Sequence, residues 1–106
     1  MKKDIEPILN EVKEGLKKIY GKRLEGLVLY GSHARGDADA GSDIDLIVLL
    51  DKVENPMDER KKFFDKIWAL DMKYDTVISA IPFDSNSYRE RNLPLLLNAR
   101  SEGIYV

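Results

Sequence analysis

The sequence predicts an α/β or α+β fold in which helices pack on a sheet of about four strands. Three observations support this prediction: a helical apolar period near the N-terminus, short apolar runs of strand length, and alternation of the two along the chain. With 106 residues, the chain suits one domain, residues 1–106, that buries a hydrophobic core without disulfides.

The first predicted helix has one apolar face, because its apolar residues recur at three- and four-residue spacing. Asp4 is suited to cap its start, Pro7 is tolerated in the first turn, and Gly21 is suited to end it. The expected apolar face consists of Ile5, Ile8, Leu9, Val12, Leu16 and Ile19.

Two strands are predicted next. Leu24–Tyr30 is short and apolar and ends abruptly at Gly31-Ser32, and residues 36–42 form a turn-rich loop. Asp43–Leu50 is apolar on both faces beyond its first residues, so we expect a central strand that is covered on both sides.

A second long helix is expected from Asn55-Pro56 to about Asp71, because proline and acidic residues favour the first turn of a helix. Its inward side chains are predicted to be Phe64, Ile67 and Trp68.

The remaining segments are a strand, a helix and a short tail. Tyr74–Ile81 is predicted to be the third strand, and Asn92–Glu102 a helix with Asn92 as its cap. The apolar tail Ile104–Val106 is suited to an added edge strand.

Composition excludes several classes of function. The net charge of −2 argues against a general nucleic-acid-binding protein, which usually carries excess positive charge. The absence of cysteine and the single histidine exclude disulfides, thiolate zinc sites, cysteine nucleophiles and multi-histidine metal sites. No apolar run approaches the ~20 residues that span a bilayer, and no apolar signal core follows the start, so we expect a cytoplasmic protein that does not bind membranes.

Asp43 and Asp45 are candidate metal ligands. Side chains alternate along a strand, so these two carboxylates are expected to point the same way. Two like charges beside a core repel each other and lose hydration, and a divalent cation removes both costs. Oxygen ligands of this kind suit Mg²⁺ or Mn²⁺.

Gly31-Ser32 is a candidate phosphate-binding turn. It follows a strand, and Ala34-Arg35 is compatible with the start of a helix. Such a turn presents backbone N–H groups to an anion, and glycine allows a phosphate to approach the main chain closely. A phosphate-binding turn shortly before an Asp-x-Asp strand combines a phosphate site with a metal site.

These two motifs, GSHARG and SDIDL, resemble the signature of the DNA polymerase beta nucleotidyltransferase superfamily. The chain is most similar to the minimal nucleotidyltransferase branch, whose members are antitoxin partners of HEPN-domain toxins. The motif covers residues 30–50, and the order of elements covers most of the chain. The resemblance implies a nucleotidyltransferase-like mixed sheet with helices packed on it.

The resemblance also implies roles for individual residues. Asp75, the only acid inside the predicted third strand, matches the family's third carboxylate, which joins Asp43 and Asp45 as a catalytic metal ligand and activates the acceptor hydroxyl. Two Mg²⁺ ions are implied, with Mn²⁺ as an alternative.

Four further residues match the family's nucleotide-binding positions. Gly31 and Ser32 match the phosphate-binding pair, and Ser42 matches the serine before the first metal ligand. Arg35 is expected either to bind phosphate or to brace the acidic cluster from behind.

By the same resemblance, the expected reaction is transfer of AMP from ATP to a tyrosine hydroxyl of a cognate HEPN ribonuclease, which neutralises the toxin. Two alternatives remain open: an antitoxin that masks its partner by contact alone, and the catalytic subunit of a small-molecule (antibiotic-type) nucleotidyltransferase. A homo-oligomer and a hetero-oligomer are both compatible with the sequence.

Overall fold

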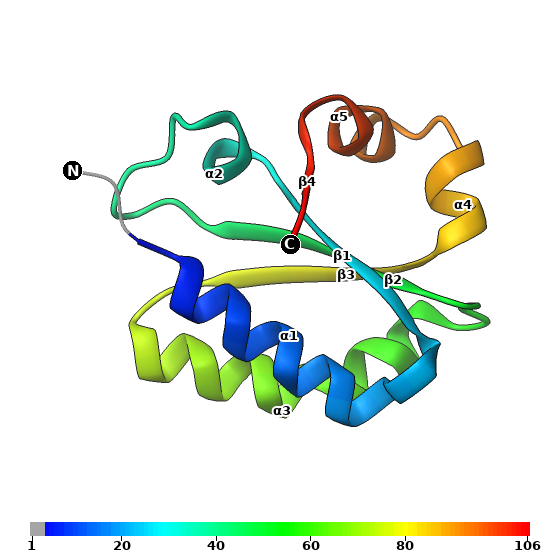
Figure 1. Cartoon of the computed structure of the whole chain (residues 1–106), viewed down its shortest axis with the longest axis horizontal. Helices are drawn as coiled ribbons and strands as arrows, with labels where there is room; N and C mark the ends of the chain where they lie inside the picture. The colour runs from blue at the N-terminus through cyan, green and yellow to red at the C-terminus, as the bar shows by residue number, and fades with distance from the viewer. Residues whose placement is uncertain (1–3) are drawn as a thin grey trace.

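The computed structural model describes residues 4–106, in which four strands form one mixed sheet in the order β3-β2-β1-β4 (Figure 1). β1 pairs with β2 and β4 in antiparallel fashion, and β2 pairs with β3 in parallel. The bounds are β1 Leu24–Tyr30, β2 Ile44–Leu50, β3 Ile78–Asp84 and β4 Ile104–Tyr105. The predicted fold class and the edge strand at the C-terminal tail are confirmed.

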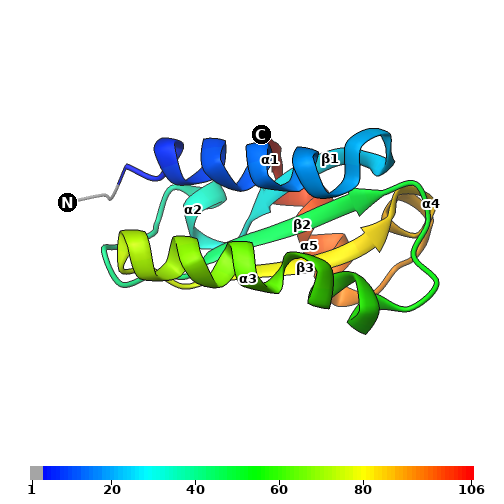
Figure 2. The same ribbon diagram turned by 90° about the horizontal axis from the view of Figure 1, so that it is seen from below.

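Helices cover both faces of this sheet (Figure 2). α1 and α3 pack on one face and α4 and α5 on the other, while the short α2 lies at one end. The bounds are α1 Glu6–Tyr20, α2 Ser32–Arg35, α3 Pro56–Tyr74, α4 Ser85–Glu90 and α5 Pro94–Glu102. None of the helices in residues 4–106 has the length and apolar character needed to cross a membrane.

β2 is buried on both faces, as expected for a central strand. Leu46 and Val48 belong to the core under α1 and α3, whereas Ile47 and Leu49 belong to the core under α4 and α5. Because side chains alternate, Asp45 lies on the same face as Ile47. The candidate site therefore lies on the α5 side of the sheet.

The first helix is confirmed with one change on its apolar face. Leu16 and Tyr20 are buried, whereas Ile19 is 39% exposed and does not belong to the core. The cap position of α1 is Ile5 rather than Asp4, although Asp4 accepts a hydrogen bond from the backbone N–H of Glu6 at 3.1 Å.

The predicted inward face of α3 is wrong in two positions. Phe64 and Trp68 are 62% and 56% exposed, and Phe63, Ile67 and Leu70 face the core instead. Both sets fit a helical period through Ile67, so spacing alone could not distinguish them. Packing on the sheet determines which face is buried, because only one of the two faces can contact it.

The boundary between α3 and β3 also differs from the prediction. α3 continues to Tyr74, and the strand begins at Ile78 rather than at Tyr74. Asp75 caps the helix in a left-handed conformation, with φ of 50°. The prediction that Asp75 lies in a strand is therefore wrong.

α4 was not predicted, and α5 begins later than expected. Asp84 caps α4 by accepting a hydrogen bond from the N–H of Ser87 at 2.9 Å. Leu93 precedes α5 as its cap residue, and Asn92 instead accepts a hydrogen bond from Arg100 at 2.9 Å.

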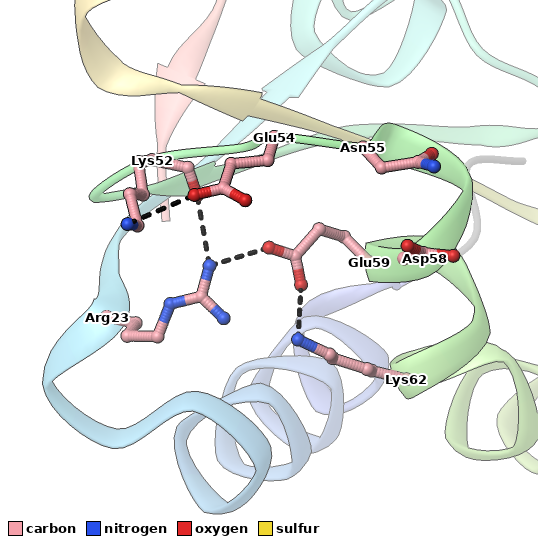
Figure 3. Close-up of a pocket in the computed structure, with 7 residues that line it drawn as sticks. All are labelled: Arg23, Lys52, Glu54, Asn55, Asp58, Glu59 and Lys62. Carbon is pink, nitrogen blue, oxygen red and sulfur yellow. Dashed lines mark hydrogen bonds and ion pairs between the residues drawn. The ribbon is translucent and has the colours of Figure 1, made fainter.

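A network of charged residues lies at the end of the sheet that is remote from Gly31 (Figure 3). Glu59 is only 5% exposed and pairs with Arg23 at 2.6 Å and with Lys62 at 3.0 Å. Burial alone would raise the pKa of Glu59, but the hydrogen bonds from these two cations outweigh it and lower the pKa. The Tyr20 hydroxyl also donates to the Glu59 backbone carbonyl at 3.1 Å. This network joins the end of α1 and the turn before β1 to α3.

We expect Glu59→Gln to lower the free energy of unfolding by roughly 1.5–3 kcal/mol at pH 7, because Arg23 and Lys62 lose the Glu59 carboxylate, although Arg23 keeps its ion pair with Asp51. Since folding lowers the pKa of Glu59, the wild-type contribution is present above the ordinary value of 4.5 and is lost as pH falls through the folded value. Urea denaturation between pH 3 and pH 7 measures both effects.

The matched control is Glu54→Gln, which removes an exposed ion pair with Lys52. It should change the free energy of unfolding by less than about 0.5 kcal/mol. Equal effects of the two variants would show that the Glu59 network does not stabilise the fold.

Candidate active site

The candidate site forms where β1 ends and β2 begins. Tyr30 and Asp45 are paired in the antiparallel ladder, so the turn after Tyr30 lies beside the first acidic residues of β2. Asp43 is exposed just before the strand, and Asp45 is partly buried inside it. The two motifs predicted to cooperate are therefore adjacent in space.

Gly31 is in close contact with the Asp45 carboxylate. Its backbone has φ of 77° and ψ of −155°, a conformation that side-chain-bearing residues rarely adopt. A Cβ atom at this position would lie 2.4 Å from Asp45 Oδ2. Only glycine fits both the turn and the space, and α2 begins directly after it, as the sequence indicated.

Asp45 has an unfavourable environment for its charge. Burial raises the pKa of its carboxyl, and repulsion from Asp43 raises it further. His33 and Arg35 act in the opposite direction without reversing the shift. Asp45 in turn adds to the effect of burial on Tyr30, whose pKa rises to about 12. The expectation of two repelling carboxylates beside a core agrees with these shifts.

Asp75 lies in the turn between α3 and β3, near Asp43. It is exposed, and it lines a small pocket of about 150 Å³ together with Asp43. Within β3, the residue paired with Asp45 is Ser79, so the strand itself presents no acid there. Among residues 4–106, no three His, Cys, Asp or Glu side chains form a ready-made metal site.

Ser42 lines the same pocket and also stabilises the loop before Asp43. Its hydroxyl accepts a hydrogen bond from the N–H of Asp39 at 3.0 Å and donates to Asp39 Oδ1 at 3.2 Å. Its carbonyl lies 3.3 Å from His33 Nε2. These contacts hold the loop against the turn that contains Ser32.

Arg35 forms two ion pairs at the end of α2. Its Nε donates to Asp37 at 3.2 Å, and its Nη1 donates to Glu102 at 3.2 Å. These partners raise the already high pKa of Arg35, so the guanidinium keeps its charge.

Two acidic residues near the site were not predicted. Glu102 accepts a hydrogen bond from the backbone N–H of Gly31 at 3.2 Å, although 71 positions separate them. Asp71 accepts from the N–H of Ile78 at 2.9 Å, and its pKa is raised by burial and by Asp43. Nothing in the local sequence marks either residue, because both act through tertiary contacts.

Comparisons with known proteins identify the family of this chain. The nucleotidyltransferase domain family matches residues 9–93. A protein of Methanocaldococcus jannaschii, provisionally assigned as a protein adenylyltransferase, is 33% identical over 78 residues, which cover 74% of this chain and 78% of the relative.

Two solved structures have a similar fold. A toxin–antitoxin crystal structure with AMP-PNP has a TM-score of 0.63 and 22% identity, covering 91% of this chain and 69% of that chain. A tri-AMPylated Shewanella oneidensis HEPN toxin in complex with MNT antitoxin has a TM-score of 0.56 and 20% identity, covering 91% and 66%.

The extent of the family match and the identity to the M. jannaschii relative agree with the resemblance of the Gly-Ser turn and the Asp-x-Asp strand. The chain therefore belongs to the nucleotidyltransferase domain family and is an enzyme of the nucleotidyltransferase class.

Proposed function

We propose that this nucleotidyltransferase transfers AMP from ATP to a tyrosine hydroxyl of a cognate HEPN-domain toxin in the cytoplasm, and so acts as an antitoxin. The observation that carries the proposal is the contact of Gly31 with Asp45, which joins a turn suited to phosphate and a carboxylate suited to a metal. The M. jannaschii relative and the AMPylated toxin in the similar complex support AMP transfer to a protein.

The size of the site also supports a protein acceptor. The pocket beside Asp43 and Asp75 has a volume of about 150 Å³, whereas pockets that enclose a small-molecule ligand usually have roughly 300–1,000 Å³. An acceptor would therefore be held mainly by surface outside this chain. A partner protein that brings both a hydroxyl group and its own contact surface meets that need.

We propose that Asp43 and Asp45 bind Mg²⁺, with Mn²⁺ as an alternative. Their oxygen ligands fit these ions, and the raised pKa of Asp45 is consistent with a charge that His33 and Arg35 compensate only in part. Mg²⁺ typically takes one or two carboxylates plus phosphate oxygens, so two acids suffice once a nucleotide is bound. The bound metal would neutralise charge on the reacting phosphate.

Gly31, Ser32, Arg35 and Ser42 are proposed to bind the nucleotide. Gly31 and Ser32 form the turn beside Asp45, and Ser42 lines the pocket that Asp43 borders. Arg35 carries a retained positive charge close enough to lower the pKa of Asp45. These residues would hold the phosphates in place while the acceptor oxygen bonds to the α-phosphorus and the bond to pyrophosphate breaks.

Asp75 is proposed to be the third carboxylate, which completes a site for a second ion and takes the proton of the acceptor hydroxyl. Its support is the pocket that it shares with Asp43. Its exposed position in the α3–β3 turn suits contact with an acceptor that another protein supplies.

Asp43→Asn and Asp45→Asn should each reduce AMP transfer by at least about 100-fold, because a metal-binding carboxylate is lost. The assay follows label from [α-³²P]ATP onto a HEPN-domain partner protein in the presence of Mg²⁺. Asp65→Asn, an exposed acid on the outer side of α3, is the control and should keep full activity. Labelling by both site variants would contradict the metal site.

Asp45→Asn should also stabilise the metal-free protein at pH 7, by roughly 0.5 kcal/mol for a partly screened charge. The pKa of Asp45 is raised by folding, so its favourable contribution is present below the ordinary aspartate pKa and disappears as pH rises through the folded value. Thermal unfolding at pH 4 and pH 7 tests this. Mg²⁺ with AMP-PNP should then stabilise the wild type but not the variant.

Asp75→Asn should slow AMP transfer at least about 10-fold while leaving AMP-PNP binding nearly unchanged, because its proposed role concerns the acceptor and the second ion. Single-turnover labelling and a separate binding measurement distinguish the two. Full activity in this variant would exclude Asp75 as the third carboxylate without affecting Asp43 and Asp45.

A further inference from the structure

The carboxylate of Glu102 lies between the turn at Gly31 and the guanidinium of Arg35. Oε1 accepts a hydrogen bond from the Gly31 N–H at 3.2 Å, and Arg35 Nη1 lies 3.2 Å from both carboxylate oxygens. The Glu102 side chain is 23% exposed, less than that of Arg35 at 47%. One carboxylate therefore binds both ends of the segment from Gly31 to Arg35.

The contact with Gly31 extends to the candidate metal ligand. The N–H of Gly31 is held by Glu102, and the Cα of Gly31 packs on the Asp45 carboxylate, where a Cβ atom would lie 2.4 Å from Oδ2. A movement of the turn away from Glu102 would therefore change the surface against which Asp45 lies. Glu102 can influence Asp45 without touching the nucleotide.

The fold holds Glu102 firmly on both sides. Leu96 and Ala99 bury α5 against β1, and Gly103 follows at a point where a Cβ atom would lie 2.2 Å from the Ala99 carbonyl oxygen. The chain then enters β4, where Ile104 pairs with Leu29. Packing and strand pairing thus place the Glu102 carboxylate before any ligand binds, which is what a positioning residue requires.

We propose that Glu102 is a positioning residue for nucleotide binding, which fixes the Gly31-Ser32 turn and orients the Arg35 guanidinium beside Asp45. This inference rests on the proposed function, because it assumes that the phosphates bind at this turn. It extends the functional region of the chain to the end of α5, beyond residues 9–93 that match the family. The carboxylate oxygens of Glu102 already accept hydrogen bonds from Gly31 and Arg35, so the role of Glu102 differs from that of a metal ligand.

The test measures binding of AMP-PNP with Mg²⁺ to the full chain by calorimetry. Glu102→Ala should weaken binding about 10-fold, as is typical when a group that orients a binding residue is removed. Glu102→Gln keeps an oxygen acceptor for the Gly31 N–H but loses the charge that orients Arg35, so its affinity should lie between those of the wild type and Glu102→Ala. Glu90→Ala, an exposed change on α4, is the control and should bind like the wild type.

A double-mutant cycle with Arg35 distinguishes positioning from a purely structural role. Because Glu102 acts partly through Arg35, the loss of affinity in the Glu102→Ala/Arg35→Ala double variant should be smaller than the product of the two single losses. A purely structural role would lower the free energy of unfolding in urea and leave the dissociation constant of the folded protein unchanged.

The two proposals fail in different ways. If Glu102→Ala binds AMP-PNP within 2-fold of the wild type while Asp45→Asn does not bind it, the role of Glu102 is rejected and the proposed function stands. If the wild type itself does not bind AMP-PNP with Mg²⁺, both proposals are overturned.

Discussion

The candidate active site depends on the close approach of Gly31 to the carboxylate of Asp45. The pairing of Tyr30 with Asp45 brings the two segments together, and the φ of 77° at Gly31 turns the chain into α2 without collision. A side chain at this position would both strain the backbone and overlap Asp45 Oδ2. One glycine therefore sets the direction of the turn and the position of the acid.

Glu59 and Asp45, which lie near opposite ends of the sheet, have pKa values shifted in opposite directions. Glu59 is paired with Arg23 and Lys62, and its pKa is lowered despite burial. Asp45 receives no side-chain hydrogen bond from residues 4–106, and burial and Asp43 raise its pKa. The first arrangement is one that stabilises a fold, whereas the second is the environment expected of the proposed metal ligand, since functional groups often conflict with stability.

Elements that are distant in sequence meet at the site. Excess negative charge near Asp45 is moderated by Arg35, which is itself held by Asp37 and Glu102. Glu102 comes from the last turn of α5, and the small pocket beside Asp43 is closed by the turn after α3. The site thus combines one contiguous motif with contributions from the second half of the chain.

Several features were determined by the sequence alone, because they depend on spacing within one segment. The helical period of α1, the two strands that flank Gly31, and the two-residue spacing of Asp43 and Asp45 needed no knowledge of distant contacts. Glycine and serine after a strand likewise indicated the turn and the short helix that follows. The fold class followed from these local patterns, and the enzyme family from the resemblance of the two motifs to a known signature.

Other features were decided only by tertiary structure. Phe63 is buried and Phe64 is exposed because only one face of α3 packs on the sheet, although both faces fit the helical spacing equally well. α3 continued to Tyr74 and moved Asp75 into a left-handed cap, since an apolar stretch does not itself define where a helix ends. Glu102 reached Gly31 because α5 and β4 pack on β1. The covalent chain sets the spacing of residues within a segment. Contacts between remote residues form only when the hydrophobic faces of the helices and the sheet pack together.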